Sequence, residues 1–162
     1  MSAKTHFSEK IVDIENIVDA IEEWGYNTSI VFTNGCFDLL HLGHVDYLSR
    51  ASALGDKLIV GVNSDASVQR IKGDNRPIQD EKSRASIIAS LQFVDAVVLF
   101  NEDTPLQLIE RIQPNTLVKG ADYKTADIVG SDFVIDKGGR VQTIPFLEGY
   151  STTSIITTIK NG

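Results

Sequence analysis

The chain has 162 residues, 42% of them hydrophobic and 23% charged, which is typical of one globular domain with a sizeable core. Its formal charge of −7 argues against a general nucleic-acid binder, because binding to the phosphate backbone depends on a basic surface. The sequence has one cysteine, no apolar run near the ~20 residues of a membrane helix and no apolar signal core at its N-terminus, so we expect a cytoplasmic protein without a disulfide or a membrane segment.

The N-terminal part is expected to be a helical lead-in over residues 1–27 that packs on a single compact domain over residues 28–162. Within the lead-in, apolar side chains recur every three or four residues over 13–25, which predicts a short helix. Asp13 is its expected cap and Gly25 its expected end.

The rest of the chain alternates between short apolar runs and amphipathic segments. The predicted strands are residues 30–33, 57–63, 94–100, 116–119 and 140–146. The predicted helices are residues 44–54, 65–71, 80–91, 104–112, 127–137 and 152–160. This alternation predicts an α/β fold, a Rossmann-like, doubly wound and mostly parallel sheet with helices on both faces. The ligand cleft of such a sheet lies at the carboxyl ends of the strands.

The turn from the first strand to the next helix carries the clearest chemical signal, TNGCFDLLHLGH over residues 33–44. His41 and His44 lie where backbone N–H groups and the helix dipole attract phosphate, and Gly43 lets a phosphate approach the backbone. Two other interpretations are surface histidines at a turn and half of a metal site. The second lacks ligands, because the chain has one further histidine and one cysteine, so no metal site is expected.

Two further segments could hold anions. Ser151, Thr152 and Thr153 join the last strand to the last helix, where hydroxyls and free N–H groups form either an anion site or simple helix caps. The other segment concentrates positive charge within fifteen residues, through Arg70, Lys72, Arg76, Lys82 and Arg84. It suits charge neutralisation in phosphoryl transfer, although a solvated charged surface is the alternative.

These residues support a resemblance. FDLLHLGH over 37–44 resembles the H-x-G-H signature of the nucleotidylyltransferase superfamily, and GYSTT over 149–153 resembles its second signature. Within the superfamily the chain is similar to the adenylyltransferase domain of the bifunctional heptose kinase/adenylyltransferase, here as a stand-alone domain. Glycerol-3-phosphate cytidylyltransferases, the nearest competitor, carry Arg-Thr before the second signature, where this chain has Phe146-Leu147.

The resemblance implies that D-glycero-β-D-manno-heptose 1-phosphate and ATP give ADP-heptose and pyrophosphate, for lipopolysaccharide core or a related heptose glycan. It implies catalytic roles for His41, His44 and Lys72, and Mg²⁺ bound with the ATP. Sugar-phosphate contacts are expected from Lys72 and Arg76. Nucleotide contacts are expected from Thr33, Asn34, Gly35, Phe37, Asp38, Gly43, Arg84, Lys119, Gly120, Asp122, Ser151, Thr152 and Thr153.

Relatives of this fold are commonly dimeric, so a homodimer is expected by analogy. Two alternatives to the heptose enzyme stay open. One is another sugar- or alcohol-phosphate nucleotidylyltransferase, such as a glycerol-3-phosphate cytidylyltransferase. The other is a nucleotide-binding module without catalysis.

Overall fold

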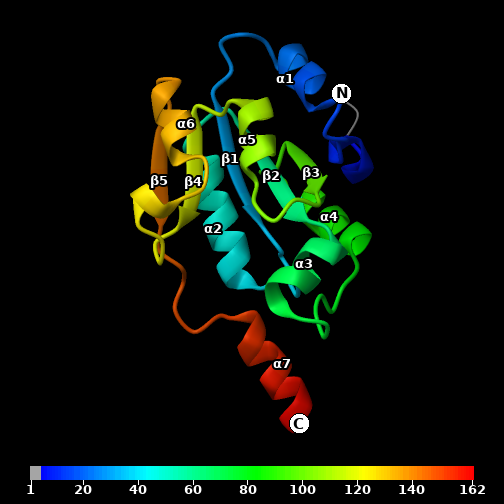
Figure 1. The fold of residues 1–162 in the computed structure, drawn as a ribbon. Coiled ribbons are helices and arrows are strands. Elements are labelled where there is room, and N and C mark those ends of the chain that lie inside the picture. Colours follow the sequence, from blue (N-terminus) through cyan, green and yellow to red (C-terminus); the bar gives the residue numbers. More distant parts are fainter. Residues whose placement is uncertain (1–4) are drawn as a thin grey trace.

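The computed structural model describes residues 5–162 and arranges five parallel strands in the order β3-β2-β1-β4-β5 (Figure 1). The strands are β1 (Ile30–Gly35), β2 (Lys57–Asn63), β3 (Ala96–Phe100), β4 (Thr116–Gly120) and β5 (Arg140–Ile144). The helices are α1 (Ile17–Trp24), α2 (Leu42–Ser52), α3 (Asp65–Lys72), α4 (Glu81–Ala89), α5 (Leu106–Ile112), α6 (Ser131–Asp136) and α7 (Thr152–Asn161), with 3-10 turns η1 (Phe7–Lys10) and η2 (Thr125–Asp127). The predicted Rossmann-like sheet is confirmed.

The strand order places the topological switch point between β1 and β4. The chain proceeds from β1 outward through β2 to β3, and then returns to build β4 on the other side of β1. The loops that leave β1 and β4 therefore diverge at their carboxyl ends. In open α/β sheets this divergence forms the ligand crevice.

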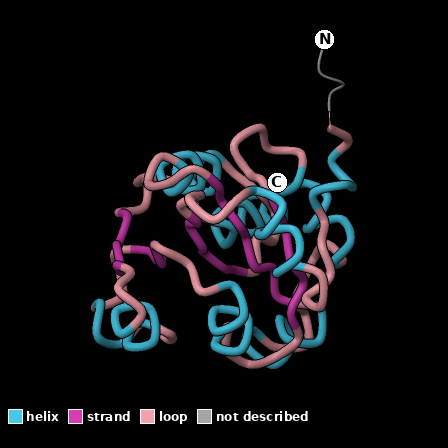
Figure 2. Tube along the Cα trace, turned by 90° about the horizontal axis from the view of Figure 1, so that it is seen from above, coloured by secondary structure: helices cyan, strands magenta, loops and turns pink. Residues whose placement is uncertain are grey.

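Two apolar layers cover the sheet, as Figure 2 shows with helices on both sides of the strands. Val31 and Val60 face the layer that contains α2 and α4, while Phe32 and Ile59 face the layer that contains α1, α5 and α6. Successive strand residues thus alternate between two buried faces, which explains why these strands read as unbroken apolar runs.

The helix of the N-terminal lead-in begins later than the sequence predicts. This helix, α1, begins at Ile17 rather than at residue 13, and Asn16 occupies the N-cap position without a side-chain hydrogen bond. Residues before it are engaged with the sheet, because Ile11 bridges to Val97 and the N–H of Val12 donates to the Val97 carbonyl at 2.9 Å. This contact extends the sheet beyond β3. Residues 1–4 of the predicted lead-in lie outside the described part.

The last helix stands apart from the two layers. Figure 1 shows α7 projecting from the carboxyl edge of the sheet, after the chain leaves β5. None of its residues is buried. Among residues 5–162 no helix combines the length and the apolar character needed to cross a membrane.

Candidate active site

Two adjoining cavities lie at the carboxyl ends of β1 and β4, with volumes of about 280 and 360 Å³. The smaller one, which we call the aromatic lobe, is walled by Phe37, Tyr47 and Phe146. The larger one, the β2–β3 lobe, includes Asn63 from the end of β2 and Thr104 from the segment after β3. Both lobes are lined by Asn34, Gly35, Cys36, Lys72, Lys119 and Tyr123, so they form one cleft.

The two signature histidines are stacked at the start of α2. Their ring centroids are 3.9 Å apart and the planes meet at 28°. His41 is the N-cap residue, and its N–H donates to Nδ1 of His44 at 3.2 Å. His44 lines the aromatic lobe, whereas His41 lies behind it with a buried Nδ1 that has no partner among the described residues.

The environment of the pair keeps both rings neutral near pH 7. Burial, together with the neighbouring His41 and Lys72, lowers the pKa of His44 to about 4. Burial also lowers the pKa of His41. Because Nδ1 of His44 accepts a hydrogen bond, its neutral ring carries the proton on Nε2. His44 is therefore a neutral hydrogen-bond donor rather than a positive charge.

Gly43 serves the histidine pair directly. A Cβ atom at this position would lie 2.9 Å from Cε1 and 3.0 Å from Nδ1 of His41, and 3.3 Å from Cβ of Tyr150. The sequence suggested that Gly43 makes room for phosphate. The structure shows that it first makes room for the His41 ring, which stacks on His44.

Tyr47 and Phe146 form an aromatic wall that the sequence analysis missed. Their rings stack with centroids 5.6 Å apart, although 99 positions separate them in the sequence. Thr33, expected to contact nucleotide, is fully buried beneath the wall and shares a 2.9 Å hydrogen bond with the Tyr47 hydroxyl. Burial raises the pKa of Tyr47 to about 12, so the phenol keeps its proton. Tyr47 lies three residues after His44, a helical spacing that could have placed it beside the cleft.

Gly120 is covered by the same wall. A Cβ atom there would collide with the Phe146 ring and would lie 2.7 Å from Oδ1 of Asp122. Gly120 and Asp122 both line the aromatic lobe, and their contacts with nucleotide stay predictions.

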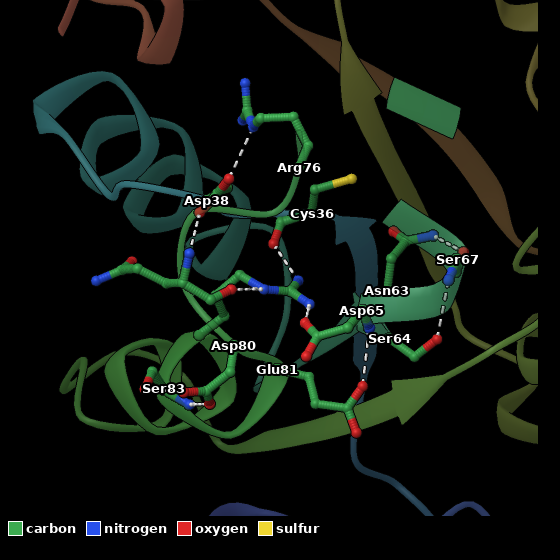
Figure 3. Close-up of polar contacts among 12 residues, drawn as sticks. Cys36, Asp38, Asn63, Ser64, Asp65, Ser67, Arg76, Asp80, Glu81 and Ser83 are labelled. Atoms are coloured by element: carbon green, nitrogen blue, oxygen red, sulfur yellow. Dashed lines mark hydrogen bonds and ion pairs between the residues drawn. The ribbon is translucent and has the colours of Figure 1, made fainter. Parts of the chain in front are cut away.

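Asp38 is a structural centre rather than a free ligand (Figure 3). Its carboxylate accepts hydrogen bonds from Arg76 Nε at 2.9 Å and from the N–H groups of Ile78 and Gln79 at 2.8 and 3.0 Å. Burial opposes ionisation of Asp38, but these donors hold its pKa below the ordinary value. Arg76 is thus paired with Asp38 and does not line either lobe, so its contact with the sugar phosphate stays a prediction.

Arg84, which was expected to contact the nucleotide, is fully buried. Its side chain has no exposed surface, so it cannot reach a phosphate in this structure. Nε donates to the Gln79 carbonyl at 3.0 Å, Nη1 to the Cys36 carbonyl at 2.6 Å and Nη2 to Asp65 at 2.9 Å. Arg84 therefore ties the turn after β1 to the start of α3 and to the segment before α4, and Figure 3 shows the first two partners, Cys36 and Asp65.

The three hydroxyl residues at the start of α7, Ser151, Thr152 and Thr153, have different surroundings. Ser151 caps α7, because its Oγ accepts from the N–H of Ser154 at 3.0 Å. Thr152 lines the aromatic lobe and donates to the Asp38 carbonyl at 2.9 Å. Thr153 lines a separate groove along α7. Only Thr152 of the three thus borders the cleft.

Residues 32–158 match the family described as Cytidylyltransferase-like. The chain is 53% identical over 156 residues to "Bifunctional protein HldE" of Campylobacter concisus and 54% identical over 151 residues to that of Helicobacter pylori strain Shi470. These matches cover 96% and 93% of this chain but 32% and 31% of the relatives, so the chain spans about a third of the length of the curated relatives it matches.

Two solved structures agree with this relationship. A lipopolysaccharide core biosynthesis protein from Thermoplasma volcanium GSS1 is 31% identical with a TM-score of 0.63, over 77% of this chain and all of that chain. A pantoate-beta-alanine ligase from Francisella tularensis, complexed with beta-gamma ATP and beta-alanine, shares the fold at 18% identity and a TM-score of 0.61, over 93% of this chain and 76% of that one. The chain is therefore a nucleotidyltransferase and belongs to the cytidylyltransferase-like family.

Proposed function

We propose that the protein is an adenylyltransferase that converts D-glycero-β-D-manno-heptose 1-phosphate and ATP to ADP-heptose and pyrophosphate. The observation that carries this proposal is the identity of 53% to "Bifunctional protein HldE" across 96% of the chain. The sequence resemblance to the heptose 1-phosphate adenylyltransferase domain points to the same reaction. The similarity to a lipopolysaccharide core biosynthesis protein from Thermoplasma volcanium supports a role in the synthesis of such glycans.

The proposed division of the cleft follows from its lining. The aromatic lobe suits the adenosine moiety, because Phe146 and Tyr47 offer ring surfaces to a base and Asp122 offers an acceptor to ribose hydroxyls. The β2–β3 lobe then takes the sugar phosphate. Its polar groups from Asn63 and Thr104 suit a polyhydroxylated substrate.

The residues at the start of α2 would act on the phosphates of ATP. Nε2–H of His44 donates to a phosphate oxygen as negative charge grows there in the transition state. His41 holds that ring in place by stacking and by its N–H bond to Nδ1. Lys72, exposed at the end of α3, lines the same lobe as His44 and supplies positive charge there.

Mg²⁺ is proposed to enter with ATP and to withdraw charge from its phosphate oxygens. Residues 5–162 gather no group of three His, Cys, Asp or Glu side chains that could hold a metal. Mg²⁺ usually keeps several waters and binds largely through substrate phosphates. A homodimer and a cytoplasmic location stay predictions of the sequence.

Pyrophosphate release from four substrate pairs tests the proposal. ATP and CTP are each offered with heptose 1-phosphate and with glycerol 3-phosphate. We expect release only from ATP with heptose 1-phosphate, and at least a ~10²-fold lower rate for His44→Ala. His6→Ala, an exposed histidine in a 3-10 cap, is the matched control and should keep the wild-type rate.

The other outcomes are equally informative. A preference for CTP and glycerol 3-phosphate would refute the heptose assignment and identify the competing cytidylyltransferase. Retained ATP binding with no release from any pair would favour the module without catalysis.

A further inference from the structure

Lys119 occupies a distinctive position in the cleft. It lies near the carboxyl end of β4, directly beside the topological switch point, and it lines both lobes. Of the six residues shared by the lobes, only Lys119 and Lys72 carry positive charge. Lys72 is exposed at the end of a helix, whereas Lys119 is partly buried on the rigid sheet. The two cations thus approach the junction of the lobes from different elements.

The Lys119 ammonium has no anionic partner within residues 5–162. Its nearest aromatic neighbour is Tyr123, with Nζ 5.6 Å from the ring centroid. Burial lowers the pKa of Lys119, and the nearby Cys36 and Asp122 oppose this only in part. Because Lys119 lines both lobes and forms no ion pair within the described residues, a structural role does not account for its charge. A phosphate placed at the junction would satisfy it.

We propose that Lys119 is a catalytic residue whose ammonium contacts the phosphoryl group that is transferred between the two substrates. The inference rests on the proposed function, because two substrates that fill separate lobes bring their phosphates together where the lobes meet. The sequence placed Lys119 among the expected nucleotide contacts and left a place near the sugar phosphate open. Its place at the junction assigns it to the reacting phosphorus.

The step that Lys119 assists is balanced without an enzyme-bound intermediate. An oxygen of the sugar phosphate forms a bond to the α-phosphorus of ATP, while the bond from that phosphorus to the bridging oxygen of the β-phosphate breaks. The electron pair of that bond leaves with pyrophosphate. Charge on the equatorial oxygens of the transferred group is then stabilised by the Lys119 ammonium, which is fixed in advance by its position on β4.

The test compares Lys119→Met with Lys119→Arg and with Lys124→Met. Lys124 is an exposed lysine from the connection after β4 and does not line the cleft, so it is the matched control. Steady-state pyrophosphate release gives kcat and both KM values, with the nucleotide and sugar phosphate that the wild-type protein prefers. Thermal unfolding of the free protein reports whether each variant folds.

We expect Lys119→Met to lower kcat at least ~10²-fold while each KM changes less than about 10-fold. Lys119→Arg should retain more activity than Lys119→Met, and Lys124→Met should match the wild type. The free Lys119→Met protein should unfold near the wild-type temperature, because Lys119 forms no ion pair within the described residues and methionine keeps the apolar part of its side chain.

Two results would overturn this role alone while the wild type is active. One is a near-wild-type kcat for Lys119→Met, and the other is a change confined to the KM of a single substrate. A wild-type protein that turned over no pair would overturn the proposed function and the role of Lys119 together.

Discussion

Replacing Arg84 by methionine tests whether this arginine stabilises the fold or binds a phosphate. Methionine fills a similar volume but removes all three hydrogen bonds of the guanidinium. The carbonyls of Cys36 and Gln79 lose their Arg84 donor, and Asp65 loses its cation. We therefore expect Arg84→Met to destabilise the protein before any substrate is added.

The magnitude follows from these three bonds. An unsatisfied buried acceptor costs about 1–3 kcal/mol, and breaking a buried ion pair costs about 3–5 kcal/mol. The Asp65 side chain is 37% exposed, so water can solvate its carboxylate and the cost stays near the lower values. The free energy of unfolding should fall by about 3–5 kcal/mol, a large part of the ~5–15 kcal/mol of a typical domain.

Urea unfolding followed by circular dichroism measures this loss as a lower midpoint with an unchanged slope. Arg50→Met is the control, because the ion pair of Arg50 with Asp46 is exposed and should contribute less than about 1 kcal/mol. If Arg84 were instead a phosphate ligand, its replacement would weaken ATP binding and leave the free energy of unfolding nearly unchanged. The structural role would be refuted if the free energy of unfolding of Arg84→Met lay within about 1 kcal/mol of the wild-type value while its affinity for ATP was weakened.

Two further predictions concern the histidine pair. The folded pKa of His44 is about 4 against an ordinary value of 6.5, so the unfolded chain binds more protons between these values and stability should fall as the pH drops through this window. Urea midpoints at pH 7 and pH 5 should therefore differ less for His44→Gln than for the wild type, and equal differences would contradict the assigned protonation. Gly43→Ala should lower kcat at least about 10-fold by displacing the His41 ring, with the fold retained, and unchanged pyrophosphate release would contradict this packing argument.

The fold was accessible from the sequence because each strand is buried on both faces. Such strands appear as apolar runs, and β2 begins and ends where the pattern predicted. The helix starts were harder to place. The sequence favours Asp13 as a cap, but the pairing of Ile11 with Val97 engages the preceding chain and delays α1 to Ile17. That pairing joins residues 86 positions apart, which local patterns do not report.

The site was accessible where its residues are close in the sequence. The spacing of His41 and His44 predicted their proximity at the start of a helix, and the structure stacks them. Charged residues were less predictable, because a guanidinium suits a phosphate, a carboxylate or a carbonyl equally well. Packing alone decides that Arg84 is buried against carbonyls and that Arg76 pairs with Asp38.

Asp38 gives the cleft a mechanical property. Its carboxylate fixes the Arg76 loop, its carbonyl accepts from Thr152 at the start of α7, and it lies three residues before His41. A displacement of α7 that preserves the Thr152 bond must pull on the backbone of the histidine turn and on that loop at the same time. The Arg76 loop, the histidine turn and the start of α7 are thus joined through one aspartate.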